Sequence, residues 1–165
     1  MKFGSKAAAL TAVFAALYAA GVVFLAPISF GVIQVRVADA LLPLSVMFGL
    51  PVAFGTSFGC SVANFYGGLG VVDVVGGAFA NFAACVLAWR IGGATVFRRF
   101  ASCLSETTVI TLVVGSYLPM LLDMPIEVGL LGVFLGSLVA INVLGFSLLE
   151  TLYRSGVAEK MREKY

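Results

Sequence analysis

The sequence predicts an all-α membrane protein, a bundle of six transmembrane helices with the N- and C-termini in the cytoplasm. Composition is the first reason: 61% of the 165 residues are hydrophobic and 11% are charged, whereas a soluble domain is about half apolar and a quarter charged. Length is the second reason, because spans of about 20 residues leave room for roughly five to seven helices and no separate soluble domain. We therefore expect a single integral-membrane domain over residues 1–165.

Apolar stretches follow one another along the chain. The predicted spans are 7–27, 40–48, 52–66, 71–89, 107–122 and 128–149. The first stretch follows Lys2 and Lys6 as the apolar part of a signal peptide would, but it is longer than the roughly 7–15 residues of such a segment. We therefore expect it to be a span. Segments 28–39, 67–70, 90–103 and 123–127 are predicted loops or turns, and 150–165 is a predicted charged cytoplasmic tail.

The stretch from residue 40 to residue 66 admits two interpretations, namely two short spans hinged at 49–51 or one helix kinked at Pro51. The distribution of positive charge favours two spans. With six spans, nine of the ten Lys and Arg residues lie in the cytoplasm, Arg36 being the exception. With five spans, the arginines of segment 90–103 would move outside, against the positive-inside rule.

Several function classes are excluded by missing residues. The chain has no His, so HExxH zinc sites and Ser-His-Asp triads are excluded, and the GxSxG pattern at 55–59 lacks a base. No P-loop sequence occurs, so the chain cannot be a P-loop ATPase by itself. Cys60, Cys85 and Cys103 form no CxxC and are interpreted as packing residues. We expect no enzyme activity, no cofactor, no metal and, at a net charge of +2, no nucleic-acid partner.

Small residues recur every fourth position in three predicted spans. The ridges are Ala8, Ala12, Ala16 and Ala20; Gly55, Gly59 and Ala63; and Gly132, Gly136 and Ala140. In lipid, such ridges let helix backbones approach closely. Each ridge can therefore serve internal packing, and the alanine ridge could instead face a partner protein.

Polar side chains inside an apolar chain mark function by default, because burying them in lipid is costly. The predicted outer half holds most of them: Gln34, Arg36, Asp39, Asn64, Asp73, Asn81, Asp123 and Glu127. In the Gln34-x-Arg36-x-x-Asp39 block, Asp39 could cap a helix with Arg36 as its ion-pair partner. Alternatively, Gln34 and Arg36 reach a ligand, and the two interpretations are compatible.

Asp73, Gly77 and Asn81 lie on one face of their predicted helix because they are four residues apart. Asn81 is then about 12 Å deeper than Asp73, and the small-residue face between them could form the wall of a pocket. The alternative is a helix-capping Asp and interhelical Asn hydrogen bonds, which also applies to Asn64. The aromatic rings of Phe30 and Tyr66 could stack on a planar ligand or belong to the interfacial aromatic belt.

Two segments carry a resemblance to a known family. Segments 28–42 and 68–77, with the Gln34-x-Arg36 block, resemble the QueT family of queuosine-precursor transporters. That family belongs to the substrate-binding (S) components of energy-coupling factor (ECF) transporters. The alanine ridge and the helix pair hinged at Leu50-Pro51 resemble this wider class, and the similarity runs from about residue 7 to residue 149.

The resemblance implies uptake across the cell membrane of a prokaryote. The S component would bind a 7-deazaguanine base from outside and dock through Ala8, Ala12 and Ala16 on a transmembrane coupling subunit, while two separate ATPase subunits supply energy. Within the site, Asp73 or Glu127 would accept the N–H groups of the base. Arg36 or Gln34 would donate to its carbonyl.

Three alternatives differ in class from this expectation or in its substrate. The chain could be an S component for riboflavin, thiamine or biotin, an autonomous facilitator or channel, or a structural subunit. A facilitator would need polar residues through the full depth of the membrane, whereas here they cluster in the predicted outer half.

Overall fold

The computed structural model describes residues 4–31 and 34–156. Every regular element in these residues is a helix, which confirms the all-α prediction. The first half of the chain contains α1 (Ser5–Phe24), α2 (Ala26–Ser29), η1 (Val37–Leu44), α3 (Ser45–Phe48) and α4 (Leu50–Gly67). The second half contains α5 (Val71–Ile91), α6 (Val96–Leu121), α7 (Ile126–Ser137), η2 (Leu138–Gly145) and α8 (Phe146–Arg154).

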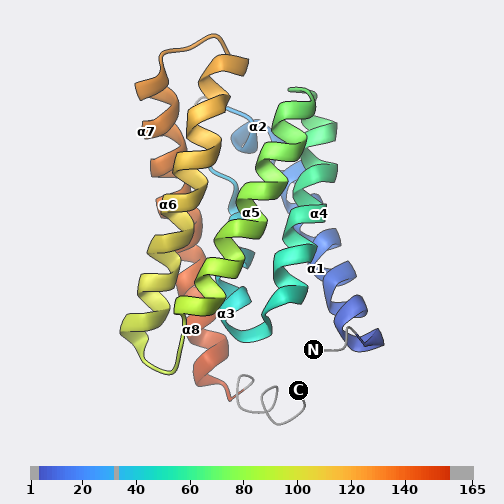
Figure 1. The fold of residues 1–165 in the computed structure, drawn as a ribbon, viewed down its shortest axis with the longest axis vertical. Helices are drawn as coiled ribbons and strands as arrows, with labels where there is room; N and C mark the ends of the chain where they lie inside the picture. Colours follow the sequence, from blue (N-terminus) through green and yellow to red (C-terminus); the bar gives the residue numbers. More distant parts are fainter. Residues whose placement is uncertain (1–3, 32–33, 157–165) are drawn as a thin grey trace.

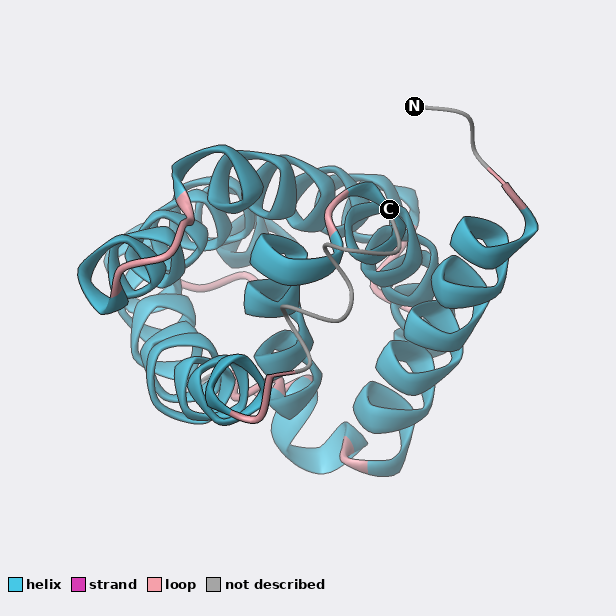
Figure 2. Cartoon of the chain, turned by 90° about the horizontal axis from the view of Figure 1, so that it is seen from below, coloured by secondary structure: helices cyan, strands magenta, loops and turns pink. Residues whose placement is uncertain are grey.

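The helices alternate in direction along the long axis of the bundle (Figure 1). Helix α1 leads to α2 at the upper end, and the chain then descends through η1 to α3. The α4–α5 and α6–α7 connections also lie at the upper end. The α5–α6 connection, the start of α1 and the end of α8 lie at the lower end. Seen from below, α1 lies at the edge of the bundle (Figure 2).

Gly49 separates two helices where one kinked helix was the alternative. Its φ of 65° lies in the left-handed region that glycine adopts readily, and it ends α3. Pro51 lies in the first turn of α4, where its missing N–H costs no helical hydrogen bond. The prediction of a hinge at 49–51 is therefore confirmed.

The predicted loop at 90–103 is wrong over most of its length. Helix α5 continues to Ile91 and α6 begins at Val96, eleven residues before the predicted start at Thr107, so the connection consists of the four residues 92–95. The Thr95 hydroxyl caps α6 by accepting a hydrogen bond from the Arg98 backbone N–H at 3.3 Å. This capping satisfies one of the free N–H groups of the first turn, and it places Arg98 and Arg99 on a helix.

Within residues 4–31 and 34–156, four helices are long and apolar enough to cross a membrane: α1, α5, α6 and the continuous helix from Ile126 to Arg154. Helix Val37–Phe48 is apolar but shorter. The last helix includes wider π-type turns over η2 and extends five residues beyond the predicted end at residue 149. Within the predicted charged tail, residues 157–165 lie outside the described part of the chain.

Glycines permit the closest helix contacts. A Cβ atom added to Gly55 or Gly59 would lie 2.7 or 2.6 Å from backbone carbonyl oxygens of α1, those of Thr11 and Ala15. A Cβ at Gly136 would collide with the Gln34 carbonyl oxygen. Both glycine ridges therefore serve internal packing, as predicted.

The alanine ridge does not serve internal packing. Ala8, Ala12, Ala16 and Ala20 are all exposed, and the buried residues of α1 are Phe14, Tyr18 and Val22. Helix α1 thus packs against α4 and η1 with one face and leaves its alanine face uncovered.

Candidate functional site

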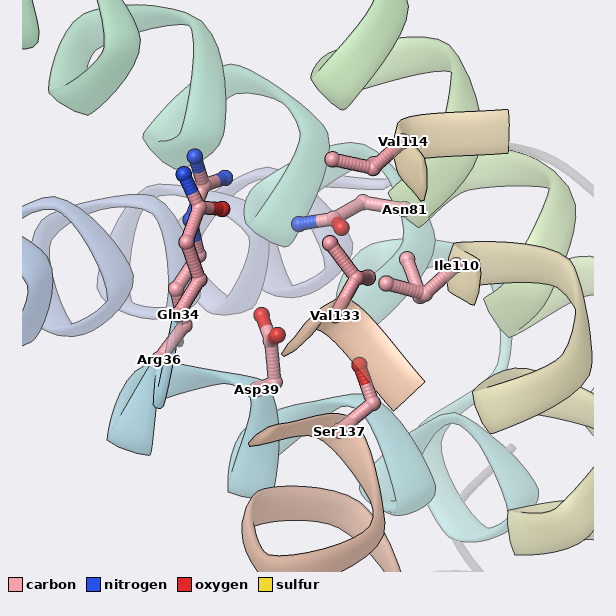
Figure 3. A pocket seen from close by; sticks show the side chains of 8 residues that line it. All are labelled: Gln34, Arg36, Asp39, Asn81, Ile110, Val114, Val133 and Ser137. Atoms are coloured by element: carbon pink, nitrogen blue, oxygen red, sulfur yellow. The ribbon is translucent and has the colours of Figure 1, made fainter. Parts of the chain in front are cut away.

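A small pocket lies inside the bundle between the segment that leads into η1 and helices α5, α6 and α7. Eight side chains line it (Figure 3): Gln34, Arg36, Asp39, Asn81, Ile110, Val114, Val133 and Ser137. The space open to the centre of a water molecule is about 10 Å³, which is room for roughly one water. In this structure the pocket is therefore too small for a ligand much larger than a water molecule.

One wall of the pocket is polar and comes from adjacent residues of the chain. Gln34, Arg36 and Asp39 are 4%, 6% and 4% exposed, and Figure 3 shows their side chains rising side by side from the segment around the start of η1. Gly136 lets α7 press against the backbone of this segment. Three of the predicted ligand-binding residues thus meet in one pocket.

Arg36 is held by three different groups. Its Nη2 lies 3.9 Å from Asp73 Oδ1, its Nη1 lies 3.7 Å from Cys60 Sγ, and its Cζ lies 5.7 Å from the centre of the Phe30 ring. Neither Nε nor Nη2 of Arg36 has a hydrogen-bond acceptor, and neither does Nε2 of Gln34. Buried donors without acceptors are costly, and these donors are available to a ligand.

Asp39 has a different partner from the one that the sequence suggested. Its Oδ1 accepts a hydrogen bond from the Tyr18 hydroxyl at 2.5 Å, and the ion pair of Arg36 is with Asp73. Asp39 lies in the first turn of η1 and makes no capping hydrogen bond. The structural alternative, a capping Asp39 paired with Arg36, is therefore wrong.

Sequence reasoning missed Tyr18, which is fully buried on α1. One signal was available, because Tyr18 is the only residue between positions 12 and 24 whose side chain can form a hydrogen bond. A polar group in such a setting needs a partner. The pattern did not say which partner it would meet.

Asp73 lies beside the pocket at the start of α5 and is fully buried. Its Oδ1 accepts a hydrogen bond from the Tyr117 hydroxyl at 3.0 Å, while Oδ2 has no partner. Asn64 Nδ2 donates to the Asp73 backbone carbonyl at 2.7 Å. Asn64 therefore forms an interhelical hydrogen bond, which was the alternative to a ligand-binding role. Tyr117 is a second residue of the site that sequence reasoning missed.

Asn81 combines the two roles that the sequence left open. It lines the pocket, and its Nδ2 donates to the Thr56 backbone carbonyl at 3.3 Å across to α4. Asp73, Gly77 and Asn81 are all buried on one face of α5, as the spacing of four residues predicted.

The opposite wall of the pocket is apolar. It consists of Ile110 and Val114 on α6 and Val133 on α7, with the Ser137 hydroxyl beside them (Figure 3). These residues could not be selected from the sequence, because Ile and Val occur throughout the spans. An apolar wall facing a row of amide, guanidinium and carboxylate groups suits a flat molecule with a polar edge.

Two of the predicted site residues lie elsewhere. Tyr66 is 65% exposed, and Glu127 is exposed in the first turn of α7. Neither lines the pocket. Phe30 is half-buried and does not line the pocket, but its ring lies 5.7 Å from Arg36 Cζ and packs against the buried cluster that contains Tyr18 and Cys60.

The lower end of the bundle holds a separate ion-pair network. Arg99 donates to Glu150 Oε2 from Nε and Nη2 at 2.9 and 2.7 Å and stacks 3.8 Å above the Tyr153 ring. Arg154 donates to Glu150 Oε1 at 2.9 Å. Because both carboxylate oxygens of Glu150 accept hydrogen bonds from arginines, we interpret the cluster as a structural contact that joins α6 to α8.

A bundle of apolar helices around a buried pocket with a polar wall defines a multi-pass membrane protein that binds a small solute for transport. The chain belongs to the QueT transporter family, whose family model matches residues 8–154. The family expected from the Gln34-x-Arg36 block is thus confirmed. No curated protein and no solved structure was found to match the chain.

Proposed function

We propose that this chain is the S component of an ECF-type importer and captures a queuosine precursor, a 7-deazaguanine base. Family membership over residues 8–154 supports the proposal. The observation that supports it most strongly is the pocket, which combines the polar side chains of Gln34, Arg36, Asp39 and Asn81 with an apolar wall.

The groups in the pocket match the edge of a guanine-like base. Such an edge presents adjacent N–H donors and one carbonyl acceptor. Asp39 is the carboxylate that lines the pocket and can accept the N–H groups, while Gln34 and Arg36 have free donors for the carbonyl. Pairings of this kind discriminate between bases by about 1–3 kcal/mol.

Binding of a base requires the pocket to open. A cavity with room for about one water cannot hold a bicyclic ring, so the apolar wall on α6 and α7 must separate from the polar segment. Closing around the base would then bury both of its faces.

The proposed topology has six crossings with both termini in the cytoplasm. Lys6 on the first turn of α1, the Arg98 and Arg99 pair at the start of α6, and Arg154 at the end of α8 occur at the lower end of the bundle. The positive-inside rule then assigns that end to the cytoplasm. The pocket, which includes Arg36, lies toward the other end and would receive its substrate from outside.

The energy for uptake would come from partners. We propose that α1 docks on a transmembrane coupling subunit through Ala8, Ala12 and Ala16, which are exposed on α1. Small side chains let a partner helix approach closely in lipid. Two ATPase subunits would complete the importer in the membrane of a prokaryotic cell.

An uptake assay tests the proposal. Bacterial cells without their own route for 7-deazaguanines would express the chain alone, or together with a coupling subunit and two ATPases, and receive radiolabelled 7-cyano-7-deazaguanine. We expect uptake only with the complete set. Equal uptake by the chain alone would identify a facilitator, and uptake of riboflavin, thiamine or biotin instead would leave the importer class but reject the substrate.

A further inference from the structure

Tyr18 is the side chain that joins the pocket to helix α1. Its hydroxyl donates to Asp39 Oδ1 at 2.5 Å, and Asp39 lines the pocket. The Tyr18 side chain itself is fully buried. This hydrogen bond links α1 directly to a residue that lines the pocket.

The base of the Tyr18 side chain is fixed by α4. A Cβ atom at Gly59 would lie 2.8 Å from Tyr18 Cβ and 2.6 Å from the Ala15 carbonyl oxygen, so the two backbones are already in contact. On α1, about one helical turn after Tyr18, a Cβ atom at Gly21 would lie 3.3 Å from the Cβ atom of Ala38, the residue before Asp39. Because the Tyr18 side chain is also fully buried, little free space surrounds it for a change of rotamer when Asp39 moves.

The same helix carries the uncovered alanine face. Ala12, Ala16 and Ala20 are exposed on the side of α1 that faces away from Tyr18. A movement of Tyr18 relative to the bundle therefore moves the surface that the proposed partner would contact. Pocket and surface are separated by the width of one helix.

We infer that Tyr18 is a positioning residue that transmits occupation of the pocket to α1. A ligand that donates N–H groups to Asp39 shares the carboxylate with the Tyr18 hydroxyl, and the adjustment of that hydrogen bond shifts α1 and its alanine face. The inference rests on the proposed function and adds a regulation to it: the affinity for the coupling subunit depends on whether the pocket is filled. By linkage, the coupling subunit then changes the affinity for the ligand by the same factor.

Tyr117 provides a matched control. Its hydroxyl also donates to a buried carboxylate at the site, Asp73 Oδ1, at 3.0 Å, but it belongs to α6. Tyr18→Phe and Tyr117→Phe therefore remove the same atom from the same kind of contact. Only Tyr18→Phe cuts a connection to α1.

The test places an environment-sensitive fluorophore on α1 through Ala16→Cys, since Cys60, Cys85 and Cys103 are buried. The purified protein is titrated with 7-cyano-7-deazaguanine, and calorimetry measures affinity in parallel. Both Phe variants should weaken binding. At saturating ligand the change in emission should be largely lost in Tyr18→Phe and should remain in Tyr117→Phe.

The outcomes separate the inference from the proposed function. If the ligand binds and the emission of Tyr18→Phe responds as fully as that of the unaltered protein, Tyr18 transmits nothing and the inference is overturned. If the unaltered protein binds no 7-deazaguanine, the proposed substrate fails. In that case, hydrogen exchange without ligand tests the connection between Asp39 and α1 through Tyr18. Faster exchange in both η1 and α1 for Tyr18→Phe, but not for Tyr117→Phe, supports this connection. Equal exchange in all three proteins rejects it.

Discussion

Arg36 shows how single residues of this protein are placed by what surrounds them. It is buried at 6% exposure in an apolar bundle, and a charge in such a setting must be paired or bind a ligand. One ion pair at 3.9 Å and a thiol at 3.7 Å are weak compensation for a guanidinium group. The unused donors are therefore the strongest residue-scale sign that the pocket is a binding site.

Asp39→Asn should weaken the binding of 7-deazaguanines. The change removes a carboxylate that can accept two N–H groups and replaces one oxygen by a donor. We expect a loss of about 1–3 kcal/mol, or roughly 5- to 150-fold in dissociation constant. Calorimetry on the purified variant measures this loss.

Glu127→Gln is the control for Asp39→Asn. It is the same chemical change at an exposed carboxylate that does not line the pocket. Its affinity should equal that of the unaltered protein. Equal losses in both variants would show that Asp39 has no special contact with the base.

At the scale of the elements, glycine determines how closely the helices approach the pocket segment. Gly136 on α7 contacts the Gln34 carbonyl group, and Gly55 and Gly59 on α4 contact the backbone of α1. The four-residue spacing of small residues predicted these contacts. It could not predict which ridge stays uncovered, because the alanine and glycine ridges have the same spacing and differ only in what the fold places beside them.

Gly136→Ala should destabilise the protein and weaken ligand binding together. The added methyl group would overlap the Gln34 carbonyl oxygen, so α7 or the pocket segment must shift. Overpacking of this kind costs about 1–3 kcal/mol. Thermal unfolding and calorimetry check both effects, with Gly4→Ala as the control, since nothing lies within 4 Å of a Cβ there. An unchanged unfolding temperature for Gly136→Ala would contradict the close contact.

Ala12→Trp should abolish uptake and spare ligand binding. A large side chain on the exposed face of α1 blocks the close approach of a partner helix but touches nothing in the pocket. Val75→Trp on α5 is the matched control, because Val75 is 61% exposed and lies outside the alanine face. Uptake at the normal rate by Ala12→Trp would count against docking through this surface.

At the scale of the whole molecule, much of the architecture followed from the sequence. Rare polar residues in an apolar chain are informative, so Gln34, Arg36, Asp39 and Asn81 could be selected in advance. Tyr18 and Tyr117 could not, because a tyrosine in a span also fits the aromatic belt. The apolar wall and the early start of α6 were missed because Val and Ile occur everywhere and a capped helix can carry arginines.

The proposed topology predicts which ends of the bundle face each side of the membrane. A membrane-impermeant maleimide added to intact cells should label Glu127→Cys, near the α6–α7 connection, and should label Ala94→Cys, in the α5–α6 connection, only after the membrane is opened. The native cysteines are buried and give a low background. The reverse labelling pattern would show that the molecule has the opposite orientation in the membrane, with the pocket toward the cytoplasm.

The most direct test of the central claim is a binding titration of the purified, unaltered protein. Thermal unfolding would be followed with 7-cyano-7-deazaguanine, 7-aminomethyl-7-deazaguanine, queuine, guanine, riboflavin, thiamine and biotin. At about 100 times its dissociation constant a ligand stabilises the folded state by roughly 2.7 kcal/mol. We predict selective stabilisation by the 7-deazaguanines. Stabilisation by riboflavin, thiamine or biotin alone, or by none of these ligands, would contradict the claim that this pocket captures a queuosine precursor.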